Sequence, residues 1–129
     1  MSLGDRLRSA REEKGWKQTY VAKMLGITSQ SLSNYERGDR DPDTSLLAKL
    51  ADLYDVTADY LLGRDLIDVK MKIDPEKVGS LADVERLADE AMELLNQALA
   101  EGIISEEQAA LSLKLFRQSL LVMMEEKNK

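Results

Sequence analysis

Short polar side chains and one cation recur along residues 29–37, at positions that share one face of a helix. They are Ser29, Gln30, Ser33, Asn34 and Arg37. Asn and Gln can pair bidentately with adenine and Ser can bond to several bases, so this set suits hydrogen bonding to the edges of nucleobases. Any surface helix also presents a solvated polar face, and the pattern alone leaves both interpretations open.

Most catalytic machinery is missing from the sequence. The 129 residues include no cysteine and no histidine, which excludes disulfides, thiolate or imidazole metal ligands and every triad with an imidazole base. Asp39, Asp41 and Asp43 are spaced like the first ligands of a calcium loop, but Pro42 interrupts them and no glutamate follows at the required distance. We therefore expect neither an enzyme nor a metal or cofactor site.

The polar strip is expected on the second of two short helices joined by a tight turn. Residues 18–25 and 29–37 follow helical spacing, and residues 26–28 separate them. So short a turn makes the helices cross steeply, and it needs a residue that tolerates positive φ, which Gly26 supplies. Ala22 is small enough to let the two helices approach. The sequence therefore predicts a helix-turn-helix with the strip on its outer face.

Helix start and stop signals predict three more helices in residues 1–64. Ser2 and Gly15 bound the first, Asp43 or Thr44 starts the fourth, and Thr57 caps a last short turn. Together with the two helices of the helix-turn-helix, these signals give five helices in the first half of the chain.

At these positions the sequence resembles the Cro and phage-repressor type of helix-turn-helix protein, also called the Xre family. The match covers residues 1–64 and consists of Gln18, Ala22, Leu25, Gly26, Ile27, Ser31, Leu32, Ser33, Tyr35, Glu36, Gly38, Pro42, Leu50, Ala51 and the run 59–63. The resemblance implies a five-helix, lambda-repressor-like DNA-binding domain.

The resemblance also implies roles for individual side chains. Three of them are implied to face the major groove of DNA: Ser29, Gln30 and Asn34. Gln18, at the start of the second helix, is implied to bind a backbone phosphate. Arg11 is implied to pair with Glu36 in the interior, which would tie the first helix to the third.

Charge is divided unevenly along the chain. Residues 1–64 carry ten Lys or Arg and ten Asp or Glu, whereas residues 65–129 carry eight and fourteen, so the whole net charge of −6 lies in the second half. The acidic total therefore does not argue against a basic face on residues 1–64, which we call the headpiece. The expected DNA contacts are Lys17, Gln18, Thr28, Ser29, Gln30, Ser33, Asn34, Arg37 and Arg40.

Acids in the loop that follows the polar strip weaken the expected affinity of a single headpiece. Asp39, Asp41 and Asp43 stand where relatives often carry more cations. A headpiece with no net charge should bind one half-site poorly, and we therefore expect a second copy to be needed.

Residues 80–129 are expected to form a helical hairpin, which follows a linker over residues 65–79. Apolar residues recur at alternating spacings of three and four, and Ser105 with Gln108 forms a capping box. The linker alternates in polarity like a short strand, but nothing nearby offers a strand for pairing. The apolar surface is too broad for two helices, so a four-helix arrangement of two chains is expected. The residues expected in this dimer contact are Leu81, Val84, Leu87, Leu94, Leu95, Leu113, Phe116 and Leu120.

Together these patterns predict an all-α, sequence-specific regulator that binds double-stranded DNA. We expect a repressor that binds a twofold-symmetric operator as a homodimer or higher homo-oligomer. The layout resembles short immunity repressors of prophages and mobile elements, which implies an antirepressor or a protease as a further partner. The alternative is a protein-interaction module of antitoxin or antagonist type, whose C-terminal helices sequester another regulator.

The sequence also bears on the location of the protein. It has neither an apolar run of membrane-spanning length nor a secretory signal, so we expect a cytoplasmic protein without a membrane partner.

Overall fold

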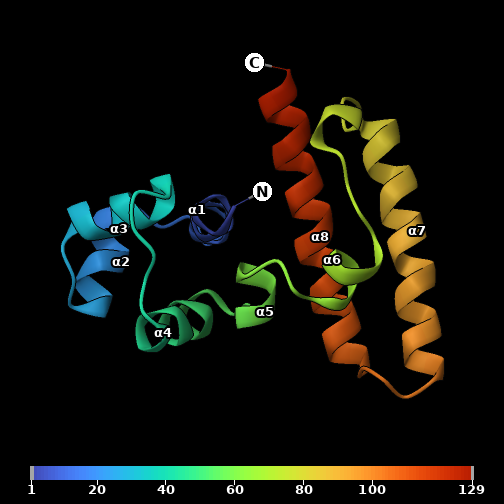
Figure 1. Ribbon diagram of the computed structural model, residues 1–129, viewed down its shortest axis with the longest axis horizontal. Coiled ribbons are helices and arrows are strands. Elements are labelled where there is room, and N and C mark those ends of the chain that lie inside the picture. Colours follow the sequence, from blue (N-terminus) through green and yellow to red (C-terminus); the bar gives the residue numbers. More distant parts are fainter. Residues whose placement is uncertain (1, 129) are drawn as a thin grey trace. The chain divides into compact units, whose positions relative to one another are not determined.

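A computed structural model describes residues 2–128 of the chain. This range contains helices and no β-strand (Figure 1), which confirms the all-α prediction. The chain divides after Gly63 into unit 1 (Met1–Gly63) and unit 2 (Arg64–Lys129). Among the described residues, no helix is long and apolar enough to cross a membrane.

Unit 1 contains five helices, each in the place that the sequence predicts. They are α1 (Leu3–Glu13), α2 (Gln18–Leu25), α3 (Ser29–Arg37), α4 (Thr44–Tyr54) and α5 (Ala58–Leu61). Four of them begin at a residue whose side chain accepts a backbone N–H of the first turn: Ser2, Thr28, Asp43 and Thr57. Such caps satisfy a helix donor that otherwise has no intrahelical partner, so the sequence alone locates these helix starts.

The crossing of α2 and α3 follows the predicted helix-turn-helix geometry. Gly26 ends α2 with φ of 69°, in the left-handed region that glycine enters without steric cost. Ala22 and Leu32 are buried at 2% and 0% exposure. Burial of these apolar side chains on the inner face leaves the polar strip of α3 on the outer face.

Close contact between α1 and the end of α3 depends on Gly4, which the sequence analysis did not single out. A Cβ atom on Gly4 would lie 2.4 Å from the carbonyl oxygen of Glu36 and 2.7 Å from that of Tyr35. Both distances are far shorter than a van der Waals contact, and both neighbours are backbone atoms. Only glycine therefore permits this approach of the two helices.

We expect Gly4→Ala to lower the free energy of unfolding by about 1 to 3 kcal/mol, because the added methyl group must push α1 away from α3. Denaturant unfolding followed by far-ultraviolet circular dichroism measures the change, with Glu12→Ala on the exposed face of α1 as control. In a helix without such a contact, Gly→Ala stabilises by up to about 1 kcal/mol. A gain in stability would thus contradict the close packing.

Unit 2 is a helical hairpin covered by a folded connector. Its elements are α6 (Leu66–Lys70), the 3₁₀ helix η1 (Pro75–Lys77), α7 (Leu81–Ala100) and α8 (Glu106–Lys127). The helices α7 and α8 run antiparallel and side by side (Figure 1). Each begins with a complete capping box, Ser80 with Asp83 and Ser105 with Gln108. The hydrogen bond from the backbone N–H of Gly79, together with those from Ser80, lowers the pKa of the Asp83 carboxyl.

The segment 65–79 differs from the extended linker that its sequence led us to expect. Asp65 caps α6, and Ile67 and Val78 are buried at 1% and 0% exposure in the core of the hairpin. Half-buried side chains of Met71 and Ile73 pack against the same core. Three of the four apolar residues of the alternation, Ile67, Met71 and Ile73, thus face the hairpin, whereas Val69 is exposed. Burial of these three stabilises a folded connector over an extended one.

The connector also changes the interpretation of the hairpin surface. Of the eight residues expected in a dimer contact, five lie in the core of unit 2, together with Ile67 and Val78: Val84, Leu87, Leu95, Phe116 and Leu120. Leu94 and Leu113 are half-buried, and Leu81 is 60% exposed. The five side chains are thus buried within one chain, where the connector supplies cover that we expected from a partner.

Candidate nucleic-acid interface

The outer face of α3 carries five of the nine residues that we expect at DNA. Gln30 and Arg37 are exposed, Ser29, Ser33 and Asn34 are half-buried, and Leu32 and Glu36 are buried on the opposite face. Thr28 lies at the helix start, where its hydroxyl oxygen accepts the backbone N–H of Ser31 at 3.0 Å. One helix thus aligns hydroxyl, amide and guanidinium groups on a single accessible side.

These side chains are hydrogen-bonded to one another. The carbonyl oxygen Oδ1 of Asn34 accepts from Nε2 of Gln30 at 3.0 Å and from Nη2 of Arg37 at 2.6 Å. The same guanidinium donates from Nη1 to Ser33 Oγ at 2.7 Å and from Nε to Asp39 Oδ2 at 3.0 Å. We call these five residues the α3 network. Sequence reasoning identified four of its members but not their mutual bonds, and it missed Asp39 as a partner of Arg37.

A buried ion pair fixes α3 against the rest of unit 1. Arg11 donates from Nε to Glu36 Oε2 at 2.8 Å and from Nη2 to Oε1 at 2.9 Å. Its Nη1 also donates to the backbone carbonyl of Trp16 at 2.8 Å. The hydrogen bond to the Glu36 carboxylate raises the pKa of the Arg11 guanidinium. Because α1, the following loop and α3 converge on one guanidinium, the pair sets the orientation of the polar face.

Gln18, which the family resemblance places at a phosphate, also binds this pair. Its Nε2 donates to Glu36 Oε1 at 3.0 Å, which joins α2 to the Arg11–Glu36 pair. A side-chain amide nitrogen carries two N–H groups, so the second remains for an outside acceptor. In addition, α2 begins at Gln18 without a side-chain cap, and the N–H groups of its first turn favour an anion.

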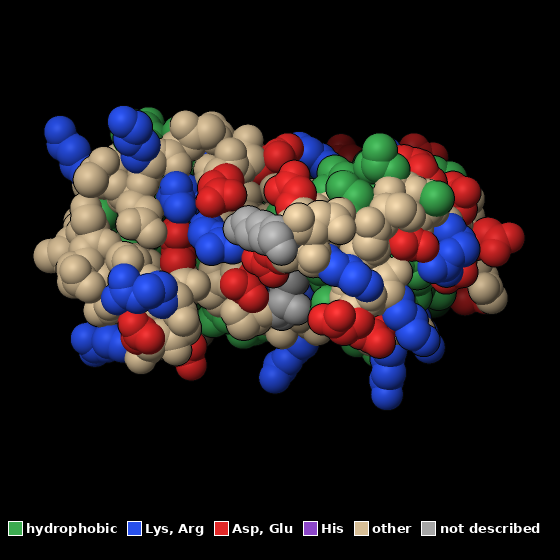
Figure 2. Space-filling view, turned by 90° about the horizontal axis from the view of Figure 1, so that it is seen from above, with side chains coloured by type: hydrophobic (Ala, Val, Ile, Leu, Met, Phe, Trp, Pro, Cys, Tyr) green, Lys and Arg blue, Asp and Glu red, His purple; other side chains and the backbone are tan. Residues whose placement is uncertain are grey.

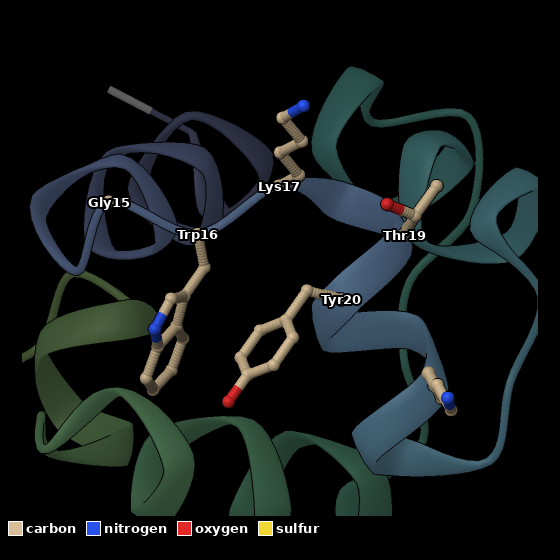
Figure 3. A pocket seen from close by; sticks show the side chains of 6 residues that line it. Gly15, Trp16, Lys17, Thr19 and Tyr20 are labelled. Atoms are coloured by element: carbon tan, nitrogen blue, oxygen red, sulfur yellow. The ribbon is translucent and has the colours of Figure 1, made fainter.

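Cations stand around the start of α2 and beyond the end of α3. Lys17 and Arg40 are exposed, as the sequence analysis expects for phosphate contacts. Figure 3 shows Lys17 directed away from the side on which Trp16 and Tyr20 lie. The Trp16 ring packs with its centroid 5.4 Å from that of Tyr20 and 6.4 Å from that of Tyr54. The aromatic rings support the loop before α2, and Lys17 is left at the surface.

The comparisons with known proteins bear on this site directly. A family model described as helix-turn-helix matches residues 7–61. The HTH-type transcriptional regulator ImmR of Bacillus subtilis is 41% identical, with 80% of this chain and 92% of ImmR covered. YqaE, an uncharacterized HTH-type transcriptional regulator of the same organism, is 30% identical over 77% of this chain and 94% of its own. Repressor protein C2 of Salmonella phage P22 is 31% identical over 50% of this chain and 30% of its own.

Two short helices joined at Gly26, an outer face of hydroxyl, amide and guanidinium groups and these matches define a helix-turn-helix protein that binds double-stranded DNA and regulates transcription. Within that class, the chain belongs to the Cro and phage-repressor type, the Xre family. The coverage of ImmR shows that the similarity extends beyond the headpiece into unit 2.

Proposed function

We propose that the protein is a dimeric repressor that reads a twofold-symmetric operator with the outer face of α3. The observation that carries the proposal is the row of amide and hydroxyl groups on α3, held in one orientation by the buried Arg11–Glu36 pair. In this proposal Ser29, Gln30 and Asn34 contact base edges, because their groups match the donors and acceptors of the major groove. A relative named as a repressor, from phage P22, supports repression rather than activation of transcription.

The backbone contacts are proposed for residues at the rim of the same face. Lys17, Gln18, Thr28, Ser33, Arg37 and Arg40 surround the base-reading residues and carry cationic or polar groups. Contacts to phosphates fix the position of a protein on the duplex without reading the sequence. The two groups of residues therefore predict different consequences of substitution.

We expect Asn34→Ala to cost about 1 to 3 kcal/mol of binding free energy at one operator position, and Gln18→Ala to weaken binding to every sequence alike. The measurement is fluorescence anisotropy on a site selected from a random DNA pool and on its single-base variants. Equal losses for both variants on all sequences would contradict base reading. If neither variant affected any DNA, the protein-interaction module would be favoured instead.

For dimerisation we propose the end of the hairpin where α7 begins and α8 ends. Leu81 is 60% exposed there, and Val122 and Met124 in the last turns of α8 are only half-buried. Figure 2 looks onto this end and shows hydrophobic side chains at the surface of unit 2. An apolar patch at the surface is typical of a contact between chains.

We expect the full chain to sediment as a dimer at micromolar concentration and Leu81→Glu to shift it toward monomer, because a carboxylate in an apolar contact loses its hydration. Ile103→Glu is the matched control, since Ile103 is 62% exposed in the turn between α7 and α8. Sedimentation velocity measures both variants. A wild-type protein that remains monomeric, or an equal shift in both variants, would exclude this contact.

A further inference from the structure

We propose that Arg37 and Asp39 determine which base Asn34 reads, and that the base is guanine rather than adenine. The two residues hold the carbonyl oxygen of Asn34 inside the α3 network, so the side chain presents only its NH₂ group to the duplex. This inference rests on the proposed function of α3 and adds the chemical class of its target.

The orientation of the Asn34 amide follows from the chemistry of its neighbour. A guanidinium group can only donate hydrogen bonds, so the Asn34 atom that lies 2.6 Å from Arg37 Nη2 must be an oxygen. The opposite orientation would bring two donors together. Gln30 Nε2 donates to the same oxygen at 3.0 Å. Both lone pairs of Asn34 Oδ1 are thereby used within the protein.

Adenine and guanine make different demands on an amide. In the major groove adenine presents an N7 acceptor and an N6 donor, so a bidentate partner must offer both a donor and an acceptor. Guanine presents two acceptors, N7 and O6, and needs donors only. Asn34 has its two N–H groups left, which match the guanine edge and cannot satisfy the N6 donor of adenine.

Gln30 differs from Asn34 in the hydrogen-bonding groups that it has left for DNA. It gives one N–H to Asn34 Oδ1 and keeps its own carbonyl oxygen and a second N–H. That combination is the one adenine requires. Asn34 and Gln30 carry the same functional group and lie one helical turn apart. The α3 network nevertheless gives them opposite preferences, guanine for Asn34 and adenine for Gln30.

Asp39 fixes the guanidinium that fixes Asn34. Gly38 ends α3 with φ of 80°, and the backbone N–H of Asp39 then donates to the carbonyl of Asn34 at 3.0 Å. This turn places the Asp39 carboxylate 3.0 Å from Arg37 Nε. Ser33 Oγ accepts from Nη1 and Asn34 Oδ1 from Nη2, so three acceptors hold the planar guanidinium of Arg37 in one position. In base selection Asp39 and Arg37 act through Asn34 and are therefore positioning residues. The two N–H groups of Arg37 outside the α3 network remain for the phosphate contact proposed above.

The test is selection of bound fragments from a random DNA pool by the full chain and its variants. The selected fragments are aligned, and each base-pair position of the operator forms one column of the alignment. Asn34→Ala first identifies the column that depends on Asn34. In that column we expect the wild type to select a G·C pair. Arg37→Met frees one lone pair of Asn34 Oδ1, while Gln30 Nε2 keeps the other. It should shift the preference toward A·T by roughly 5- to 150-fold, the range of discrimination of one bidentate contact. Asp39→Asn should shift it less, in the same direction.

Arg40→Met is the matched control, because it removes the same charge two residues beyond Gly38, where Arg40 is exposed. It should weaken binding and leave the column unchanged. Wild-type selection of A·T in the Asn34 column, or a G·C preference that survives Arg37→Met, overturns the proposal while base reading by α3 stands. If no sequence is selected, or if Asn34→Ala alters no column, the proposed function itself fails.

Discussion

Replacing Arg11 with alanine should lower the free energy of unfolding of unit 1 by about 3 to 5 kcal/mol, because the change leaves a buried carboxylate without its partner. The side chains of Arg11 and Glu36 are only 12% and 3% exposed. Burial, and secondarily the neighbouring Glu36, raises the pKa of the Tyr54 hydroxyl, and Tyr54 is itself buried. An uncompensated Glu36 would therefore be poorly hydrated.

Chemical denaturation followed by circular dichroism and by fluorescence of Trp16, the single tryptophan of the chain, checks this expectation. Arg8→Ala is the control on the same helix, because the Arg8–Glu12 pair spans 3.9 Å and both side chains are exposed. Such a pair contributes at most about 0.5 kcal/mol. Comparable losses for Arg8→Ala and Arg11→Ala would show that the buried pair has no special role. Arg11→Met combined with Glu36→Leu should recover most of the lost stability, since no charge is left unpaired.

In unit 2, Ile67→Ala should cost about 2 to 5 kcal/mol of stability through the cavity that it leaves beneath the connector. Ile67 is 1% exposed and packs in one core with Val78, Phe116 and Leu120. The loss arises only if the connector is folded onto the hairpin, because truncation of an exposed linker residue removes no packing.

Val69→Ala provides the matched control for Ile67, since it lies on the same short helix α6 and is 64% exposed. Its effect should stay within about 0.5 kcal/mol. Thermal unfolding followed by circular dichroism reports the helices of both units, whereas Trp16 fluorescence reports unit 1 alone. We expect part of the circular dichroism transition to move to lower temperature while the Trp16 transition keeps its midpoint. Equal, small effects of Ile67→Ala and Val69→Ala would contradict the packed connector.

Helix positions were predictable from the sequence because their signals are local. A capping side chain such as Thr28 or Ser105 satisfies a backbone donor three residues ahead, so a window of a few residues contains the whole interaction. The turn at Gly26 is equally local, because its positive φ is a property of one residue. The outer face of α3 follows from helical periodicity once Leu32 is assigned to the core.

The features that the sequence did not predict depend on contacts between distant residues or on competition between donors for one acceptor. The close approach at Gly4 involves carbonyl groups more than thirty residues away, which no local window of sequence contains. Packing of the connector depends on the shape of the hairpin that follows it. The bond from Gln18 to Glu36 and the sharing of Asn34 Oδ1 by two donors depend on side-chain geometry. Periodicity carries no information about these choices.

The ion pair of Arg37 with Asp39 has a consequence for the ions that surround DNA. A cation that reaches a duplex with its charge unopposed displaces condensed counterions, and the release of these ions makes affinity fall as salt rises. Arg37 already has a carboxylate 3.0 Å from its Nε, so its approach releases fewer of them. Occupancy of the operator should therefore vary less with ionic strength than it would if Arg37 had no carboxylate partner. The attraction between protein and DNA at low salt should be weaker for the same reason.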